Sequence, residues 1–124
     1  MTRDEVMAMT DGELNSMAWT MLYTEKPWRH WANADGTVTI NGEQTSIADY
    51  ATDISAAWQL VEYLDWIFSI EQDWHSGEYE AVFHLVDEDS GGNMRPYKWC
   101  DAKDKSVPSA ITRAFILAMS TKSI

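Results

Sequence analysis

The chain has 124 residues, of which 45% are hydrophobic, and a formal net charge of −11 at pH 7. This length predicts one domain over residues 1–124. No segment has the about 20 apolar residues of a membrane span, no apolar signal region opens the chain, and the single Cys100 excludes an internal disulfide. We therefore expect a cytoplasmic protein that does not associate with membranes.

The negative charge is concentrated in the middle of the chain. Residues 30–94 contain thirteen acidic residues and no lysine or arginine, whereas the remaining segments have nine basic and seven acidic residues. A field of this sign repels nucleic acid and favours basic partners. Acidity also promotes solubility, and that simpler interpretation stays open.

Two capping boxes lie near the N-terminus. Thr2 with Glu5 predicts a short helical turn, and Thr10 with Glu13 predicts a helix over about 11–23, where apolar residues recur at helical spacing.

The next segment favours strands. The Asn41-Gly42 pair predicts a hairpin near 37–46, and residues 28–31, WRHW, are a candidate edge strand.

The central segment, YATDISAAWQLVEY, predicts a helix that runs to about Ile70. Thr52 or Asp53 is expected to cap its first turn. Its expected apolar face is formed by Ile54, Ala57, Trp58, Val61, Leu64 and Phe68. Trp58 is then a core anchor, whereas Trp66 falls among polar residues and is either covered by a loop or available to a partner.

The C-terminal half favours antiparallel strands and one helix. Residues 79–87 alternate between apolar and polar, 90–93 form a turn, 97–102 return as a strand, and 73–78 are a possible short strand. The final helix is expected to start around Pro108, with its buried face formed by Ile111, Ala114, Phe115 and Ala118.

This order of elements predicts an α+β fold. We expect an α/β/α-type sandwich, in which a mainly antiparallel sheet of about 4–5 strands is packed by about three helices.

No signature for catalysis or metal binding is strong. Asp73, His75 and Glu78 are close in sequence, but clustered acids in an acidic protein are usually a solvated face. The histidines and Cys100 lack metal-ligand spacing. We therefore expect a protein that is not an enzyme and that has no catalytic residues, no metal site and no cofactor.

Three segments resemble the phage ABA sandwich domain family of small phage and prophage proteins. They are MTRDEVMAM at the N-terminus, YATDISAAWQLVEYL over 50–64, which is the most specific, and PSAITRAFILAM over 108–119. The resemblance implies a phage origin and a layered α/β fold, and it carries over no catalytic residues.

The first functional hypothesis is a non-enzymatic counter-defence inhibitor, such as an anti-CRISPR protein, acting in the bacterial host cytoplasm. As a nucleic-acid mimic, it would bind a basic, nucleic-acid-binding host protein and would not bind nucleic acid directly. The expected partner-binding residues are Glu62, Asp65, Trp66, Glu71, Asp73, Trp74, Glu78, Asp87, Glu88 and Asp89.

The alternative hypothesis is a small-molecule binder that sequesters a nucleotide immune signal at a subunit interface. Two basic segments interleave cations with aromatic rings, which suits a phosphate and a stacked base. The expected ligand-binding residues are Lys26, Trp28, Arg29, Arg95, Lys98 and Trp99. The oligomeric state is left open by the sequence, and a homodimer is the default expectation, since exposed aromatic residues such as Trp66 often mark self-association.

Overall fold

The computed structural model describes residues 2–23, 30–32, 37–88 and 94–122. The elements, in chain order, are α1 (Arg3–Met7), α2 (Asp11–Tyr23), β1 (His30–Ala32), β2 (Thr37–Ile40), β3 (Glu43–Ser46), α3 (Ile54–Leu64), β4 (Ile67–Gln72), β5 (Tyr79–Glu88), β6 (Met94–Asp104) and α4 (Val107–Lys122).

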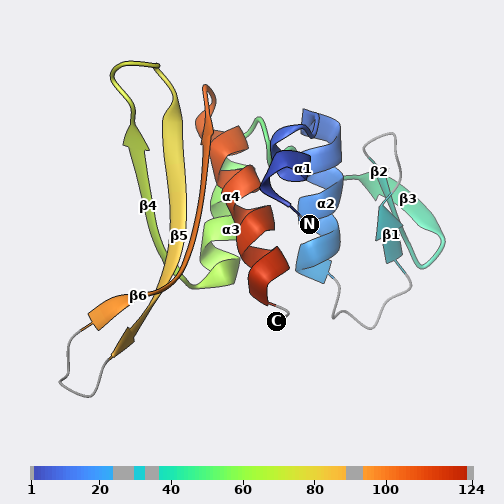
Figure 1. Ribbon diagram of the computed structural model, residues 1–124. Coiled ribbons are helices and arrows are strands. Elements are labelled where there is room, and N and C mark those ends of the chain that lie inside the picture. Colours follow the sequence, from blue (N-terminus) through green and yellow to red (C-terminus); the bar gives the residue numbers. More distant parts are fainter. Residues whose placement is uncertain (1, 24–29, 33–36, 89–93, 123–124) are drawn as a thin grey trace.

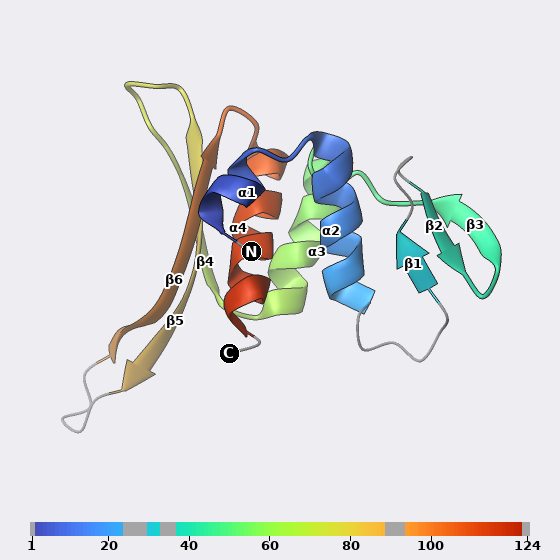
Figure 2. The same cartoon turned by 45° about the vertical axis from the view of Figure 1, so that its right-hand side comes forward.

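The helices lie between two antiparallel sheets (Figure 1). The larger sheet has the order β4-β5-β6 and packs against α4, with α3 beside it. The smaller sheet has the order β1-β2-β3 and lies on the far side of α2, as the rotated view also shows (Figure 2). The predicted α+β class with antiparallel pairing is confirmed. The layer order differs from a sandwich with a central sheet, because the described strands form two sheets of three with the helices between them.

Helix α4 forms the centre of the core. The predicted face of Ile111, Ala114, Phe115 and Ala118 is confirmed, since none of these residues is more than 1% exposed. The alternation predicted for β5 is confirmed as well, because Ala81 and Phe83 turn inward and are fully buried. The opposite face of the same sheet is therefore directed away from the helices.

Both N-terminal capping boxes are formed. The hydroxyl of Thr2 accepts a hydrogen bond from the backbone N–H of Glu5 at 3.2 Å, and the Glu5 carboxylate accepts one from the backbone N–H of Thr2 at 3.2 Å. Thr10 and Glu13 make the same exchange at 3.3 and 3.0 Å. These caps satisfy N–H groups that a helix start otherwise leaves without intrahelical partners.

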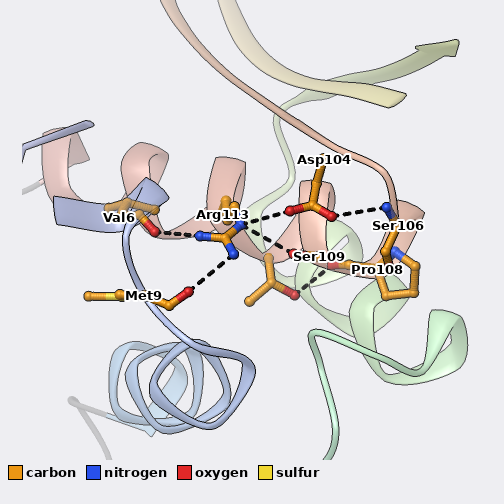
Figure 3. A network of polar contacts seen from close by, with 8 residues as sticks. Val6, Met9, Asp104, Ser106, Pro108, Ser109 and Arg113 are labelled. Atoms are coloured by element: carbon orange, nitrogen blue, oxygen red, sulfur yellow. Dashed lines mark hydrogen bonds and ion pairs between the residues drawn. The ribbon is translucent and has the colours of Figure 1, made fainter. Parts of the chain in front are cut away.

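A buried arginine joins the N-terminal segment to α4. Arg113 is 8% exposed, and its guanidinium donates to the backbone carbonyls of Val6 at 2.6 Å and Met9 at 3.1 Å (Figure 3). It also donates to the Ser109 hydroxyl at 3.2 Å and to the Asp104 carboxylate at 3.3 Å. The planar guanidinium can serve all four acceptors at once, so this contact fixes α1 against α4.

The central helix ends earlier than the sequence suggested. Asp65 adopts a left-handed conformation, with φ 55°, directly after Leu64. This conformation terminates α3, and residues 67–72 form β4. The prediction of a helix to about Ile70 was therefore wrong, because the apolar spacing continues past the C-cap into a segment, IFSI, that also suits a strand.

The buried face of α3 also differs from the expected one. Ile54 is 49% exposed and Trp58 is 47% exposed, so neither is a core anchor. The buried residues are Ala56, Ala57, Leu60 and Leu64. Two small alanines allow α3 to approach its neighbours closely and rotate the buried stripe away from Ile54 and Trp58. The cap was predicted correctly: the Asp53 carboxylate accepts from the backbone N–H of Ser55 at 2.9 Å.

The predicted hairpin over 37–46 is present as β2 and β3. Asn41 and Gly42 at its turn both have positive φ, 51° and 89°, which a tight two-residue turn requires. The edge strand preceding it is β1, which pairs His30 with Ile40; residues 30 and 31 of the expected strand lie in it, and residues 28 and 29 lie outside the described residues. Residues 73–78 form a turn in place of the possible strand.

Candidate interaction surface

No described element covers the outer face of the β4-β5-β6 sheet, which forms one side of the molecule in Figures 1 and 2. The antiparallel register orders this face into cross-strand rows of three residues. These rows are Ile67-His84-Trp99, Ser69-Val82-Asp101 and Glu71-Glu80-Lys103. The face therefore changes from aromatic and apolar at one end to charged at the other.

The first row presents a stacked aromatic pair. The rings of His84 and Trp99 are 5.2 Å apart between centroids and are inclined by 22°. Trp99 is 56% exposed, and Ile67 across the sheet is 49% exposed. An exposed ring of this kind can stack on a ligand or pack against a protein partner.

The third row places the carboxylates of Glu71 and Glu80 on neighbouring strands, and Asp101 of the second row lies close to Glu80. Burial raises the pKa of Glu80, and the neighbouring Asp101 carboxylate raises it further by repulsion. Asp101 in turn pairs with Arg3 of α1, whose guanidinium lies 3.3 Å from its carboxylate. Negative charge is thus crowded on this part of the sheet, and cations from distant segments neutralise part of it.

The turn between β4 and β5 combines acids with an exposed tryptophan. Trp74 is 89% exposed. Asp73, directly before it, accepts from the backbone N–H of His75 at 2.9 Å and pairs with Lys103 at 3.5 Å, and these contacts lower the pKa of its carboxyl. The hydroxyl of Ser76 accepts a hydrogen bond from the backbone N–H of Glu78 at 3.2 Å. The side chains of Asp73 and Ser76 therefore both shape the turn.

The structure brings some of the expected partner-binding residues together. Glu71, Asp73, Trp74 and Glu78 lie at the β4–β5 turn. The others are placed elsewhere, and one lies outside the described residues.

Glu62 is exposed on α3, and Asp65 is its exposed C-cap, so both lie at the opposite end of β4 from the turn. Trp66 is half-buried and packs against the core, which explains why a large aromatic residue stands among polar residues in the sequence. Asp87 and Glu88 belong to the last residues of β5, and Asp89 lies outside the described residues.

The residues of the alternative ligand site are placed only in part. Lys26, Trp28 and Arg29 lie outside the described residues. Arg95 and Lys98 belong to β6, where the register pairs Arg95 with Asp87 and Lys98 with Leu85. Their strand lies on the opposite side of the helices from β1 (Figure 1).

Two shallow hollows lie away from this surface. One, of about 350 Å³, is lined by Ile54, Ser55 and Trp58, and the other, of about 600 Å³, lies along the β2–β3 hairpin between Ile40 and Thr45. None of the described residues that line these two hollows is a lysine or an arginine. Among the described residues no group of three histidine, cysteine, aspartate or glutamate side chains is arranged to hold a metal ion. No helix in the described part of the chain has the length and apolar character needed to cross a membrane.

The residues of the most specific resemblance have structural roles in this fold. Tyr50 is 3% exposed, and burial raises its pKa to about 12, so that its phenol remains protonated at neutral pH. Asp53 caps α3, and Ala57 is fully buried.

Sequence reasoning missed four residues of the surface. Glu80, Asp101, Lys103 and Arg3 come from β5, β6 and α1, and none was expected to participate. The alternation of β5 placed Glu80 on the outer face, but the strand register that brings the others beside it cannot be read from spacing alone.

The comparisons with known proteins agree with this architecture. The family model described as the phage ABA sandwich domain matches residues 7–116. A crystal structure of a phage protein from Bacillus cereus ATCC 14579 is similar, with a TM-score of 0.64 and 19% sequence identity over 92% of this chain and 90% of that chain. No curated protein matches this sequence. Because the family model covers most of the sequence, the chain belongs to the phage ABA sandwich domain family.

Proposed function

We propose that this phage protein is a non-enzymatic inhibitor of a host defence, and that it binds a basic, nucleic-acid-binding host protein in the bacterial cytoplasm. The observation that carries the proposal is Trp74, which is 89% exposed between Asp73 and Glu78 at the β4–β5 turn. An exposed tryptophan within a charged rim has the composition of a binding hot spot.

The charge distribution supports the same partner chemistry. Glu71 is exposed at the end of β4, and the sheet face behind it carries Glu80 and Asp101. Arg3 pairs with Asp101 and Lys103 pairs with Asp73, so we place the strongest attraction at Glu71 and Glu78, which flank the turn. A basic protein that normally contacts phosphates would meet carboxylates at this turn, with Trp74 available for apolar contact.

Capture from a bacterial lysate tests the proposal. The purified chain is immobilised, exposed to a nuclease-treated lysate at low and at high salt, and the retained proteins are identified by mass spectrometry. We expect a basic nucleic-acid-binding protein that is retained at low salt and lost at high salt, since exposed charges are screened within about 8 Å at physiological ionic strength.

Matched variants locate the binding surface. The test variant combines Glu71→Gln, Asp73→Asn and Glu78→Gln. The control combines Asp11→Asn, Glu43→Gln and Asp49→Asn, which removes the same charge from exposed positions outside the larger sheet. Loss of capture in the test variant alone supports the proposal, and equal loss in both variants would reduce it to a general effect of acidity.

A second candidate function rests on the aromatic row. Trp99 is 56% exposed and stacked on His84, in the strand that also contains Arg95 and Lys98. A nucleotide base can stack on such a ring while cations meet its phosphate. If this candidate is correct, denaturing the chain purified from infected cells releases a nucleotide, and Trp99→Ala abolishes its retention.

A further inference from the structure

The two edges of the larger sheet differ in how they are protected from pairing. Strand β6 contains Pro96, lysines at 98 and 103, and an irregular register opposite Leu85 and Val86. Proline, lysine and bulges are the devices with which proteins keep edge strands from pairing with other chains. Strand β4, at the other edge, has the sequence IFSIEQ and contains none of them.

Strand β4 is also exposed and regular. It pairs with β5 over six consecutive residues without a bulge, and no described strand pairs with its other edge. Ile67 is 49% exposed and Ile70 is 37% exposed on opposite faces of the strand, and Trp58 of α3, 47% exposed, contacts Phe68 from the helix side. A regular, apolar edge that lacks these devices favours pairing with another strand.

The sequence of β4 can pair with a second copy of itself without placing like charges opposite each other. When two copies run antiparallel about a two-fold axis at Ile70, Ile70 faces its own counterpart, Phe68 faces Gln72, and Ser69 faces Glu71. The members of each pair lie on the same face of the joined sheet, as antiparallel pairing requires. Glu71 is the only charged residue of the strand, and in this register it faces a serine.

We propose that two copies of this chain pair through β4 in this register, so that their larger sheets join into one continuous six-stranded sheet. A second copy is the favoured occupant because one strand supplies both halves of the register without opposing like charges, which is the condition for an isologous interface. Continued beyond the strand, the same register places Trp66 of one copy opposite Trp74 of the other copy. Trp74 is exposed and follows shortly after the end of β4.

The proposed dimer goes beyond the proposed function, and the stability of the dimer responds to salt in the opposite direction from the binding of a basic partner. Each copy carries a net charge of −11, so screening reduces the repulsion between the copies and strengthens the dimer. Binding of a basic partner weakens under the same change. A salt series therefore distinguishes failure of one proposal from failure of the other.

Sedimentation equilibrium of the full chain tests the dimer. We expect a dimer in the wild type. Ile70→Lys places two ammonium groups at the axis, so the dissociation constant of the dimer should rise by a factor of about ten or more. The matched control is Ser46→Lys, an exposed residue of edge strand β3 in the other sheet, which should leave the dimer unchanged. A monomeric wild type, or a dimer that a folded Ile70→Lys variant leaves intact, would overturn the proposal; circular dichroism establishes folding.

Cysteine crosslinking tests the register without depending on a disruptive variant. Residues that face each other across an antiparallel pair have Cα atoms about 4.5–5.5 Å apart, within the range of a disulfide. Under mild oxidation Ile70→Cys should therefore form a crosslinked dimer. Ser69→Cys should do so poorly, because its counterpart is the diagonal neighbour at about 7–8 Å. Efficient crosslinking of Ser69→Cys and not of Ile70→Cys, or of neither, would contradict this register.

Discussion

Replacing Arg113 by methionine should destabilise the protein strongly. The guanidinium is 8% exposed and hydrogen-bonds to Val6, Met9, Ser109 and Asp104 (Figure 3). Methionine fills a similar volume but donates no hydrogen bond, so the carbonyls of Val6 and Met9 lose their side-chain donor. The Val6 carbonyl keeps its hydrogen bond from the backbone N–H of Met9 at 3.2 Å, so the main loss is at the Met9 carbonyl, and a polar group left unsatisfied costs about 1–3 kcal/mol. Removing one partner of a fully buried ion pair costs about 3–5 kcal/mol, and the Asp104 side chain is 27% exposed, so the pair contributes toward the lower end of this range. We therefore expect the free energy of unfolding to fall by about 3–5 kcal/mol.

Urea denaturation followed by tryptophan fluorescence measures this change. The control is Arg3→Met, which breaks the pair with Asp101, where the arginine side chain is 50% exposed. An exposed pair contributes about 0–1 kcal/mol, so the control should remain close to the wild type. Equal losses for the two variants, or a loss below about 1 kcal/mol for Arg113→Met, would refute the argument that burial makes this arginine structural.

Three further predictions concern single positions. Asp53→Ala removes the cap of α3 and should lower the free energy of unfolding by about 1 kcal/mol, whereas Asp53→Asn should retain most of it, as thermal denaturation can establish. Asp65→Gly should raise the free energy of unfolding by up to about 1 kcal/mol, because glycine adopts the left-handed conformation at φ 55° without a Cβ penalty; a loss of stability would show that the Asp65 side chain contributes more than its backbone costs. The raised pKa of Glu80 means that the folded state retains its proton after the unfolded state has released it, so this residue's contribution to stability falls as the pH rises above the ordinary glutamate pKa. Glu80→Gln should therefore stabilise the protein at pH 7 relative to the wild type and change little at pH 4, and an equal effect at both pH values would contradict this assignment.

Local signals in the sequence predicted the elements whose ends are determined locally. The capping boxes at Thr2 and Thr10, the Asn41-Gly42 turn and the Asp53 cap are interactions between residues at most three positions apart, and each is formed. The buried face of α4 was predicted for a similar reason, since its apolar spacing is unambiguous.

The errors arose where tertiary packing decides between two local possibilities. The apolar spacing through Phe68 suits a helix and a strand alike, and the left-handed Asp65 divides the segment into α3 and β4. The rotation of α3 depends on how closely Ala56 and Ala57 pack, which exposes Trp58. For the same reason Trp66, expected to be on the polar side of a helix, is half-buried after the helix has ended.

The candidate surface depends on contacts over long sequence distances. Arg3 reaches Asp101 across 98 positions, and Lys103 reaches Asp73 across the sheet. A cation-free sequence stretch therefore does not produce a cation-free surface, because neighbouring strands contribute their own charges. The turn around Trp74 is assembled locally, since Asp73, Trp74 and Glu78 lie in one loop, but there too a distant strand contributes a cation, because Lys103 pairs with Asp73.

The most direct test of the proposed function is the salt dependence of binding between this chain and the basic host protein that it captures. Affinity would be measured by titration calorimetry from about 50 to 500 mM salt, a range over which the screening length falls from about 14 to 4 Å. The proposal predicts affinity that weakens steadily with salt and that the combined Glu71, Asp73 and Glu78 variant reduces far more than the control variant does. Affinity that is independent of salt and unchanged in the combined variant would contradict it.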